Sequence, residues 1–280
     1  MSLKILFIGD VVGAPGRKIV GQVLPRLIPR WGIGLVICNA ENSAGGSGLT
    51  VKCHEELVDA GVDVFTMGDH VYRKDEIFNL FERTDRILRP ANFPPDAPGE
   101  EFVIVPAKDG TEVAVFTLLG RTYMRPVDCP FRAADRVLAQ IGLNAKVIFV
   151  DIHAEATSDK NLLGRYLAGR ASAVLGTHTH VATADEQILS GGTAYQTDVG
   201  MTGPHDSILG RRYDRVLSTT LRFTPTHFDV ATGDPRINGA LVEVDQSSGR
   251  ALSIERVSID QDETRRLLTD TSEKAPRVPN

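Results

Sequence analysis

Residues 4–10 read KILFIGD, an apolar run, Ile5–Ile8, that passes through Gly9 to the carboxylate of Asp10. Four later stretches repeat this arrangement, each an apolar run followed by acidic, amide or imidazole side chains: Leu35–Cys38 before Glu41 and Asn42, Val62–Met67 before Asp69 and His70, Val147–Val150 before His153, and Ala171–Leu175 before His178 and His180. Each run is too short for a buried helix and rich in Val, Ile or Phe. That is typical of strands buried on both faces.

Longer segments of helical character separate these runs. We predict helices over Arg17–Leu27, over Val51–Ala60 with Thr50 as its N-cap, and over Thr157–Leu167 with Thr157 or Ser158 as its cap. Strands and helices in alternation indicate right-handed crossovers and a largely parallel sheet. The sequence therefore predicts an α/β fold.

Two stretches break the alternation and read as antiparallel hairpins. Phe102–Leu118 turns around Lys108-Asp109-Gly110, and Ala240–Ile259 turns around Ser247-Ser248-Gly249. These hairpins are candidates for a second packed sheet. No linker divides the chain, so we expect a single domain over 1–268, followed by a flexible tail over 269–280.

Composition excludes several classes of protein. The chain has 280 residues, with 31 basic and 36 acidic side chains and a formal net charge of -5, which argues against an extended nucleic-acid groove. No apolar run approaches the ~18 residues of a membrane span. The three cysteines lack a C-x-x-C spacing and favour neither a disulfide framework nor a thiolate zinc site. We expect a cytoplasmic protein without membrane segments.

The polar residues after the apolar runs indicate a metal site. Loops at the carboxyl ends of strands in an α/β sheet converge on one rim, so the pattern brings carboxylates and four of the seven histidines together there. Such closely spaced side chains would repel one another, or their polar atoms would remain without partners, unless cations bound them. Imidazole plus carboxylate without thiolate suits zinc, manganese, iron or cobalt. About seven candidate ligands suit two metal ions that share a ligand. Such paired ions stabilise both the attacking and the leaving oxygen when a group at phosphorus is displaced. Hydrolysis of a phosphate ester is the leading hypothesis.

Several segments carry a family resemblance: KILFIGDVVGAPGR, AENSAGGSGLT, the GDH of TMGDH, RPANFP, DIHAEATS, GRASAVLGTHTHVATAD and TAYQTDVGMTGPHDSILG. Together they resemble the YmdB-type metallophosphoesterases, a branch of the calcineurin-like phosphoesterase superfamily. The resemblance runs from residue 3 to about residue 259. It implies a four-layer sandwich of two mixed β-sheets flanked by helices. It also implies a two-metal phosphodiesterase that hydrolyses 2′,3′-cyclic and 3′,5′-cyclic nucleotides, with iron or manganese as the metals.

The resemblance also assigns roles by position. One ion would be held by Asp10, Glu41, Asn42 and His180, and the other by Glu41, Asp69, His153 and His178. Glu41 would bridge the ions, and His70 would be the general acid. A hydroxide between the ions would attack phosphorus in line, while His70 protonates the leaving ribose oxygen. Asn92 and His205, in shared segments, are candidate substrate contacts, as is Arg121 after a predicted strand. Asp151 and Asp198 are candidates either to orient the imidazoles or to cap strand ends.

One position departs from the family pattern, which commonly reads Gly-Asn-His where this chain reads Gly68-Asp69-His70. An aspartate still offers an oxygen to a metal, but its charge makes the centre less attractive to a phosphodiester anion. We therefore predict weaker substrate binding than asparagine would give.

Other readings remain open. A phosphomonoesterase or nucleotidase would use the same centre, and a regulatory protein would bind a nucleotide with weak turnover. A structural protein with incidental histidines leaves the clustering unexplained. A homo-oligomer is also possible.

Overall fold

The computed structural model describes residues 1–269. Within them the strands are β1 (Ser2–Ile8), β2 (Ile33–Asn39), β3 (Val64–Thr66), β4 (Ile87–Leu88), β5 (Phe102–Pro106), β6 (Glu112–Leu119), β7 (Val147–His153), β8 (Ala173–Thr177), β9 (Gln187–Leu189), β10 (Thr193–Gln196), β11 (Gly203–Asp206), β12 (Gly233–Asp245) and β13 (Ala251–Ile259). The helices are α1 (Gly13–Trp31), α2 (Val51–Asp59), α3 (Glu76–Phe81), α4 (Pro130–Ile141), α5 (Thr157–Leu167), α6 (Tyr213–Arg222) and α7 (Gln261–Thr269).

The strands form two mixed sheets. The seven-stranded sheet has the order β11-β12-β1-β2-β3-β4, with β13 paired to β12, and the six-stranded sheet has the order β5-β6-β7-β8-β10-β9. In the first sheet β1, β2 and β3 run parallel, while β12 pairs antiparallel with β1. In the second sheet β6, β7, β8 and β10 run parallel. Each sheet therefore presents the carboxyl ends of several parallel strands at one edge.

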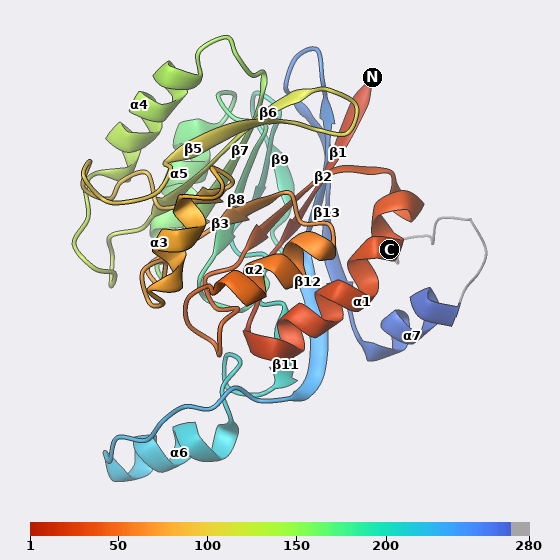
Figure 1. Ribbon diagram of the computed structural model, residues 1–280. Coiled ribbons are helices and arrows are strands. Elements are labelled where there is room, and N and C mark those ends of the chain that lie inside the picture. Colours follow the sequence, from red (N-terminus) through yellow and green to blue (C-terminus); the bar gives the residue numbers. More distant parts are fainter. Residues whose placement is uncertain (270–280) are drawn as a thin grey trace.

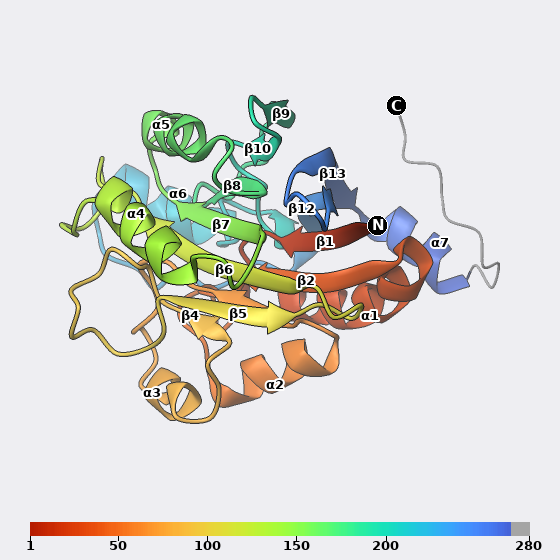
Figure 2. The ribbon, with the colours of Figure 1, turned by 90° about the horizontal axis from the view of Figure 1, so that it is seen from above.

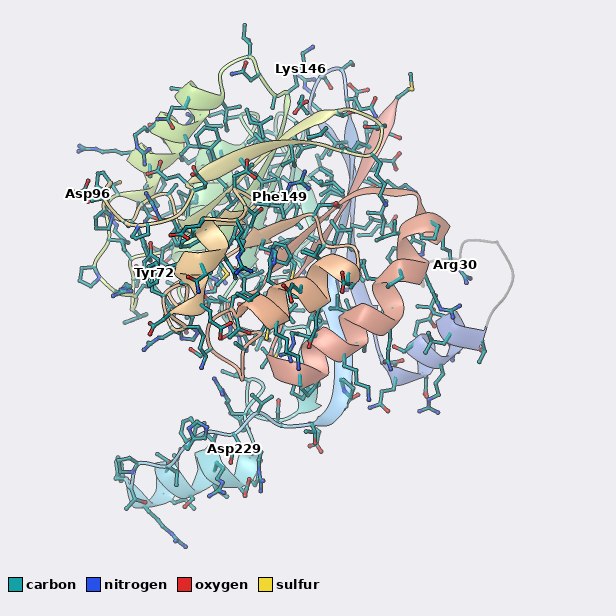
Figure 3. The ribbon with its side chains drawn as sticks, in the orientation of Figure 1. Arg30, Tyr72, Asp96, Lys146, Phe149 and Asp229 are labelled. Carbon is teal, nitrogen blue, oxygen red and sulfur yellow. The ribbon has the colours of Figure 1, made fainter. Side chains whose placement is uncertain are left out.

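The alternation of side chains along each strand builds the layers. Ile5 and Phe7 of β1 point between the sheets, and the Phe7 ring lies 5.0 Å from that of Phe149, near the centre of the molecule in Figure 3. Leu6 and Ile8 point the other way, into a core with α1, α2 and α3. On the far side of the six-stranded sheet, α4 and α5 cover a third core. Figure 2 shows the resulting succession of helices, sheet, sheet and helices, which confirms the predicted four-layer sandwich.

Both predicted hairpins are present, but they do not make a sheet of their own. The β5–β6 hairpin extends the six-stranded sheet, and the β12–β13 hairpin extends the seven-stranded one. Thr50 caps α2 as predicted, because its side chain accepts a hydrogen bond from the Cys53 backbone N–H at 3.3 Å. The predicted cap of α5 is wrong: the helix begins at Thr157, and its N-cap is Ala156, which has no capping side chain.

Two peripheral features complete the fold. The helix α6 stands away from the sandwich (Figure 1) and buries none of its side chains. Thr269, expected in a tail, is the last residue of α7, and the rest of that predicted tail, 270–280, lies outside the described residues. Within residues 1–269, the helices lack the combination of length and hydropathy that a membrane span requires. A single domain over 1–268 stays a prediction, which the core shared by the two sheets supports.

Candidate metal centre

The predicted ligands lie at the carboxyl ends of strands from both sheets. Asp10 follows β1, Glu41 follows β2 and Asp69 follows β3 in the seven-stranded sheet, whereas His153 ends β7 and His178 follows β8 in the six-stranded sheet. The apolar-run pattern alone put these strand ends on one rim. The structure corrects this, because two stacked sheets supply them, as the family resemblance implies.

Four side chains converge most closely. Glu41, Asp69, His153 and His178 each offer one ligand atom, and these atoms all lie within 4.8 Å of one another. His153 Nε2 is 3.1 Å from Glu41 Oε1 and 3.4 Å from Asp69 Oδ1. His178 Nδ1 is 3.0 Å from His153 Nε2 and 3.6 Å from Asp69 Oδ1. Two imidazole nitrogens and two carboxylates therefore face one shared volume.

Asp10, Asn42 and His180 adjoin this cluster. His180 Nε2 lies 3.8 Å from Asp10 Oδ1 and 3.2 Å from Asn42 Nδ2. Asp10 is fully buried, and its Oδ2 accepts a hydrogen bond from the His178 backbone N–H at 3.1 Å. Asp10 Oδ1 lies 4.0 Å from His153 Nδ1, so these three residues are in contact with the four-residue cluster. The structure thus brings all the predicted ligand side chains together.

The charges of this arrangement fit metal ions. Asp10 Oδ1 and Asp69 Oδ1 are buried and have no hydrogen-bond partner within residues 1–269. Buried carboxylate oxygens are costly unless a hydrogen bond or a cation satisfies them. Burial raises the pKa of Asp10, although His180 and His153 partly offset the effect. Burial acts on Glu41 in the same direction, yet the adjacent His153 imidazole holds the pKa of Glu41 below its usual value. Cations between these groups would satisfy the open oxygens, and the donor set suits zinc, manganese, iron or cobalt.

A model of the YmdB-like protein family matches residues 6–257. The chain belongs to the YmdB-like family. It is 46% identical over 260 residues to a Bacillus subtilis (strain 168) protein named 2′,3′-cyclic-nucleotide 2′-phosphodiesterase, a match that covers 93% of this chain and 98% of that protein. The family predicted from the sequence motifs is confirmed.

Two crystal structures share the fold. One is of a Thermus thermophilus protein described as hypothetical, with a TM-score of 0.87 and 41% identity over 92% of this chain and 99% of that one. The other is of a Mycoplasma pneumoniae protein described as a novel phosphatase, with a TM-score of 0.87 and 32% identity over 96% of this chain and 98% of that one. These likenesses confirm the two-sheet sandwich.

The second nitrogen of each imidazole is held by a group that sequence reasoning did not identify as its partner. His153 Nδ1 lies 2.9 Å from Thr177 Oγ1, which donates to Asp151 Oδ1 at 2.7 Å. Asp151, a candidate either to orient an imidazole or to cap a strand end, therefore reaches His153 through Thr177. Burial raises the pKa of Asp151 to about 6. Such partners fix the ring orientation and the tautomer of a metal-ligating histidine.

The other two imidazoles of the YmdB-like centre have local partners. His178 Nε2 lies 3.2 Å from Glu155 Oε2, which leaves Nδ1 facing the cluster. Burial, together with the neighbouring His153, lowers the pKa of His178 to about 4, so the ring is neutral and its lone pair is open to a metal. His180 Nδ1 donates to the Leu209 carbonyl at 3.1 Å and turns Nε2 inward. Glu155 stands two residues after His153 in the DIHAEATS motif, the one signal that could have identified it.

The His178–His180 turn has a strained backbone and is held by hydrogen bonds to a buried aspartate. His178 and His180 have φ values of 93° and 65°, in the left-handed region that non-glycine residues rarely occupy. Between them, Thr179 donates to Asp198 Oδ2 from its backbone N–H at 3.2 Å and its hydroxyl at 2.8 Å. The same oxygen accepts from Lys160 Nζ at 2.6 Å, and both charged side chains are buried. Asp198 therefore holds the turn through Thr179 rather than through an imidazole.

His70 lies beside the cluster without joining it. Its backbone N–H donates to Glu41 Oε2 at 3.0 Å, and its Nδ1 donates to Asn42 Oδ1 at 2.9 Å. The second ring nitrogen of His70, Nε2, lies 3.7 Å from Asp69 Oδ2. The His70 side chain is 27% exposed. The ring can therefore present a proton to a ligand at the open side of the centre.

The predicted substrate contacts fall in three different settings. Asn92 is buried, and its amide binds the backbone of Leu119 and Asp128, so it ties loops together. Arg121 is exposed, and its backbone N–H donates to Asp159 at 2.8 Å. His205 lines a cavity that also includes His180. Contact with a substrate stays a prediction for each.

Proposed function

We propose that this chain is a metal-dependent phosphoric diester hydrolase that opens 2′,3′-cyclic nucleotides, with 3′,5′-cyclic nucleotides as further substrates. The observation that carries the proposal is the convergence of Glu41, Asp69, His153 and His178 within 4.8 Å. The Bacillus subtilis relative named for this activity shares 46% of its residues across nearly its whole length. Because that relative is named a 2′-phosphodiesterase, the bond that breaks is the one between phosphorus and O2′.

Two ions, with iron and manganese as the expected metals, would be held by the two ligand groups that share Glu41. When bound they would lower the pKa of a water and draw charge from the phosphate oxygens. The chain contributes the positioning of these ligands: Thr177, Glu155 and the Leu209 carbonyl fix the imidazoles, and Asp198 fixes the turn between two of them.

His70 supplies the proton that the leaving oxygen requires. In the reaction water adds its oxygen to phosphorus, the bond from phosphorus to O2′ breaks, and O2′ takes a proton from His70 Nε2. The water gives up a proton to solvent, from which His70 regains one. The contact from Nδ1 to Asn42 keeps the ring turned with Nε2 toward the open side. A positioned general acid of this kind typically contributes 10²–10⁴-fold.

The test compares leaving groups in the manganese-loaded protein. His70→Ala should lower kcat by about 100-fold for 2′,3′-cyclic AMP, whose alkoxide leaving group needs the proton. It should lower kcat far less for bis(p-nitrophenyl) phosphate, whose phenolate needs none. Equal losses would count against the acid role. A wild-type protein that hydrolyses neither diester with manganese or ferrous ion would overturn the proposed function.

A phosphomonoesterase is the second candidate, because the Mycoplasma pneumoniae structure is described as a phosphatase. Rates for p-nitrophenyl phosphate beside those for cyclic nucleotides decide between the two. A regulatory protein that binds nucleotides with weak turnover would show binding without comparable rates. A cytoplasmic location and a homo-oligomer stay predictions, which cell fractionation and sedimentation velocity would test.

A further inference from the structure

A cavity of about 550 Å³ adjoins the metal centre on the side of Asp10. His180 belongs to both, since its ring reaches the ligand cluster and its residue lines the cavity. The floor comes from β12 and β13, and β12 pairs directly with β1 (Figure 1). The Gly9 backbone N–H, next to Asp10, donates to the carbonyl of Asn238 in that floor at 3.0 Å. A ligand with its phosphate at the metal centre can therefore extend into this space.

The walls of the cavity are apolar with a few fixed polar groups. Val199, Met201 and Val257 supply buried apolar surface. His205 faces them with both ring nitrogens engaged: Nδ1 donates to the Gly203 carbonyl, and Nε2 accepts from Asn238 Nδ2, each at 3.0 Å. Burial lowers the pKa of His205, so the ring is neutral. Apolar walls with a small number of placed polar groups are typical of sites for small organic ligands.

The charges at the cavity are already paired. Arg236 Nε donates to Asp234 Oδ2, and Arg256 Nε donates to Glu186 Oε1, both at 2.9 Å. Each guanidinium that lines the cavity thus has its own carboxylate. A second phosphate would find no excess positive charge there, which favours an uncharged part of a ligand.

One buried acceptor in the wall lacks a donor. The Gln196 side chain is fully buried, and its Nε2 donates to the carbonyls of Thr183 at 3.0 Å and Asp198 at 2.9 Å. Its Oε1 has no hydrogen-bond partner within residues 1–269. Because buried polar atoms are nearly always satisfied, this oxygen is an open acceptor that the N–H group of a ligand would satisfy.

We propose that this cavity binds the nucleoside part of the substrate, with the cyclic phosphate at the metal centre. A heterocyclic base has apolar faces for Val199 and Val257, and it has N–H groups on its edge. The volume lies within the ~300–1,000 Å³ of small-molecule sites. The assignment rests on the proposed function for the place of the phosphate, but nucleoside binding can be measured without turnover.

The test fills the cavity from its exposed strand. Ser258 lines the cavity from the edge strand β13 and is itself exposed, and tryptophan is well tolerated in strands. Ser258→Trp should lower the ratio of kcat/KM for 2′,3′-cyclic AMP to that for bis(p-nitrophenyl) phosphate at least tenfold. The matched control is Leu252→Trp, at an exposed position on the same strand outside the cavity, which should leave the ratio unchanged. Arg256→Trp is the second variant if Ser258→Trp does not fold.

A second arm uses adenosine and the metal-free protein. Saturation-transfer NMR should show adenosine signals with wild type and Leu252→Trp and none with Ser258→Trp. If the cavity-filling variants kept these signals, or lowered both hydrolysis rates equally, the cavity assignment would be overturned. If wild type bound adenosine in a Ser258-dependent way but hydrolysed no cyclic nucleotide, the proposed function would fail while the cavity assignment stood.

Discussion

Asp69 places a negative charge where the pattern implied by the family resemblance commonly has a neutral amide. Its Oδ1 faces His153 Nε2 at 3.4 Å and His178 Nδ1 at 3.6 Å, and its Oδ2 lies 3.7 Å from His70 Nε2. The burial of Oδ1 without a hydrogen-bond partner in residues 1–269 supports its assignment as a metal donor. The same charge opposes the approach of a phosphodiester anion.

We therefore expect Asp69→Asn to raise kcat/KM for 2′,3′-cyclic AMP by about fivefold at low salt, on the scale of one screened charge interaction near ~1 kcal/mol. Most of the change should lie in KM, because the substituted group acts on binding. Steady-state kinetics of the manganese-loaded variant at two ionic strengths give the answer. A lowered or unchanged kcat/KM would contradict this prediction.

Glu155 acts on the centre through its contact with His178. Its carboxylate accepts from Nε2 and thereby keeps Nδ1 free for a metal. Glu155→Ala should weaken manganese binding by about 10–100-fold, whereas Glu155→Gln, which keeps an oxygen acceptor, should recover part of the loss. Isothermal titration with Mn²⁺ measures both, and Glu255→Ala, another exposed glutamate, is the control. Equal Mn²⁺ affinities for wild type and Glu155→Ala would show that Glu155 does not support metal binding.

At the scale of elements, α5 is tied to the ligand turn by one buried ion pair. Lys160 on α5 and Asp198 are each about 1% exposed, and Asp198 also holds Thr179 between the two strained histidines. The helix, the end of β8 and the metal centre are thus coupled. Loosening the pair should release the left-handed turn.

Lys160→Met should lower the free energy of unfolding by about 3 kcal/mol, because it leaves the Asp198 charge buried without its partner. The double variant Lys160→Met/Asp198→Asn should lose less than the sum of the two single variants. Urea denaturation of the four metal-free proteins gives the coupling. Additive losses would show that the two residues do not act as a pair.

The helix α2 carries a histidine that should make stability depend on pH. The His54 ring lies 4.7 Å from that of Phe65, and burial lowers the pKa of His54 below 6.5. The unfolded chain therefore binds a proton there more readily than the folded one, so stability falls as pH drops below about 6.5. His54→Phe should reduce the loss of unfolding free energy between pH 7.5 and 5.5. An identical pH dependence in both proteins would count against this assignment.

At the scale of the whole molecule, local patterns gave the strands and the ligand types, whereas pairing between distant segments set the rest. The run in KILFIGD predicts a strand that ends at Asp10, and the structure has β1 over Ser2–Ile8. That β1 pairs with β12, from Ser2↔Asp245 to Ile8↔Gly239, depends on contacts that no local pattern encodes. For the same reason, the apolar runs alone did not show which strand belongs to which sheet. The contact between Glu155 and His178 likewise depends on the packing of distant segments.

We propose that side chains from both sheets hold two metal ions between them. Anomalous diffraction from a manganese-loaded crystal tests it most directly. We expect two peaks, one among Glu41, Asp69, His153 and His178, and one beside Asp10, Asn42 and His180, with Glu41 reaching both. A crystal of active protein with no peak among these side chains would rule out this two-metal centre.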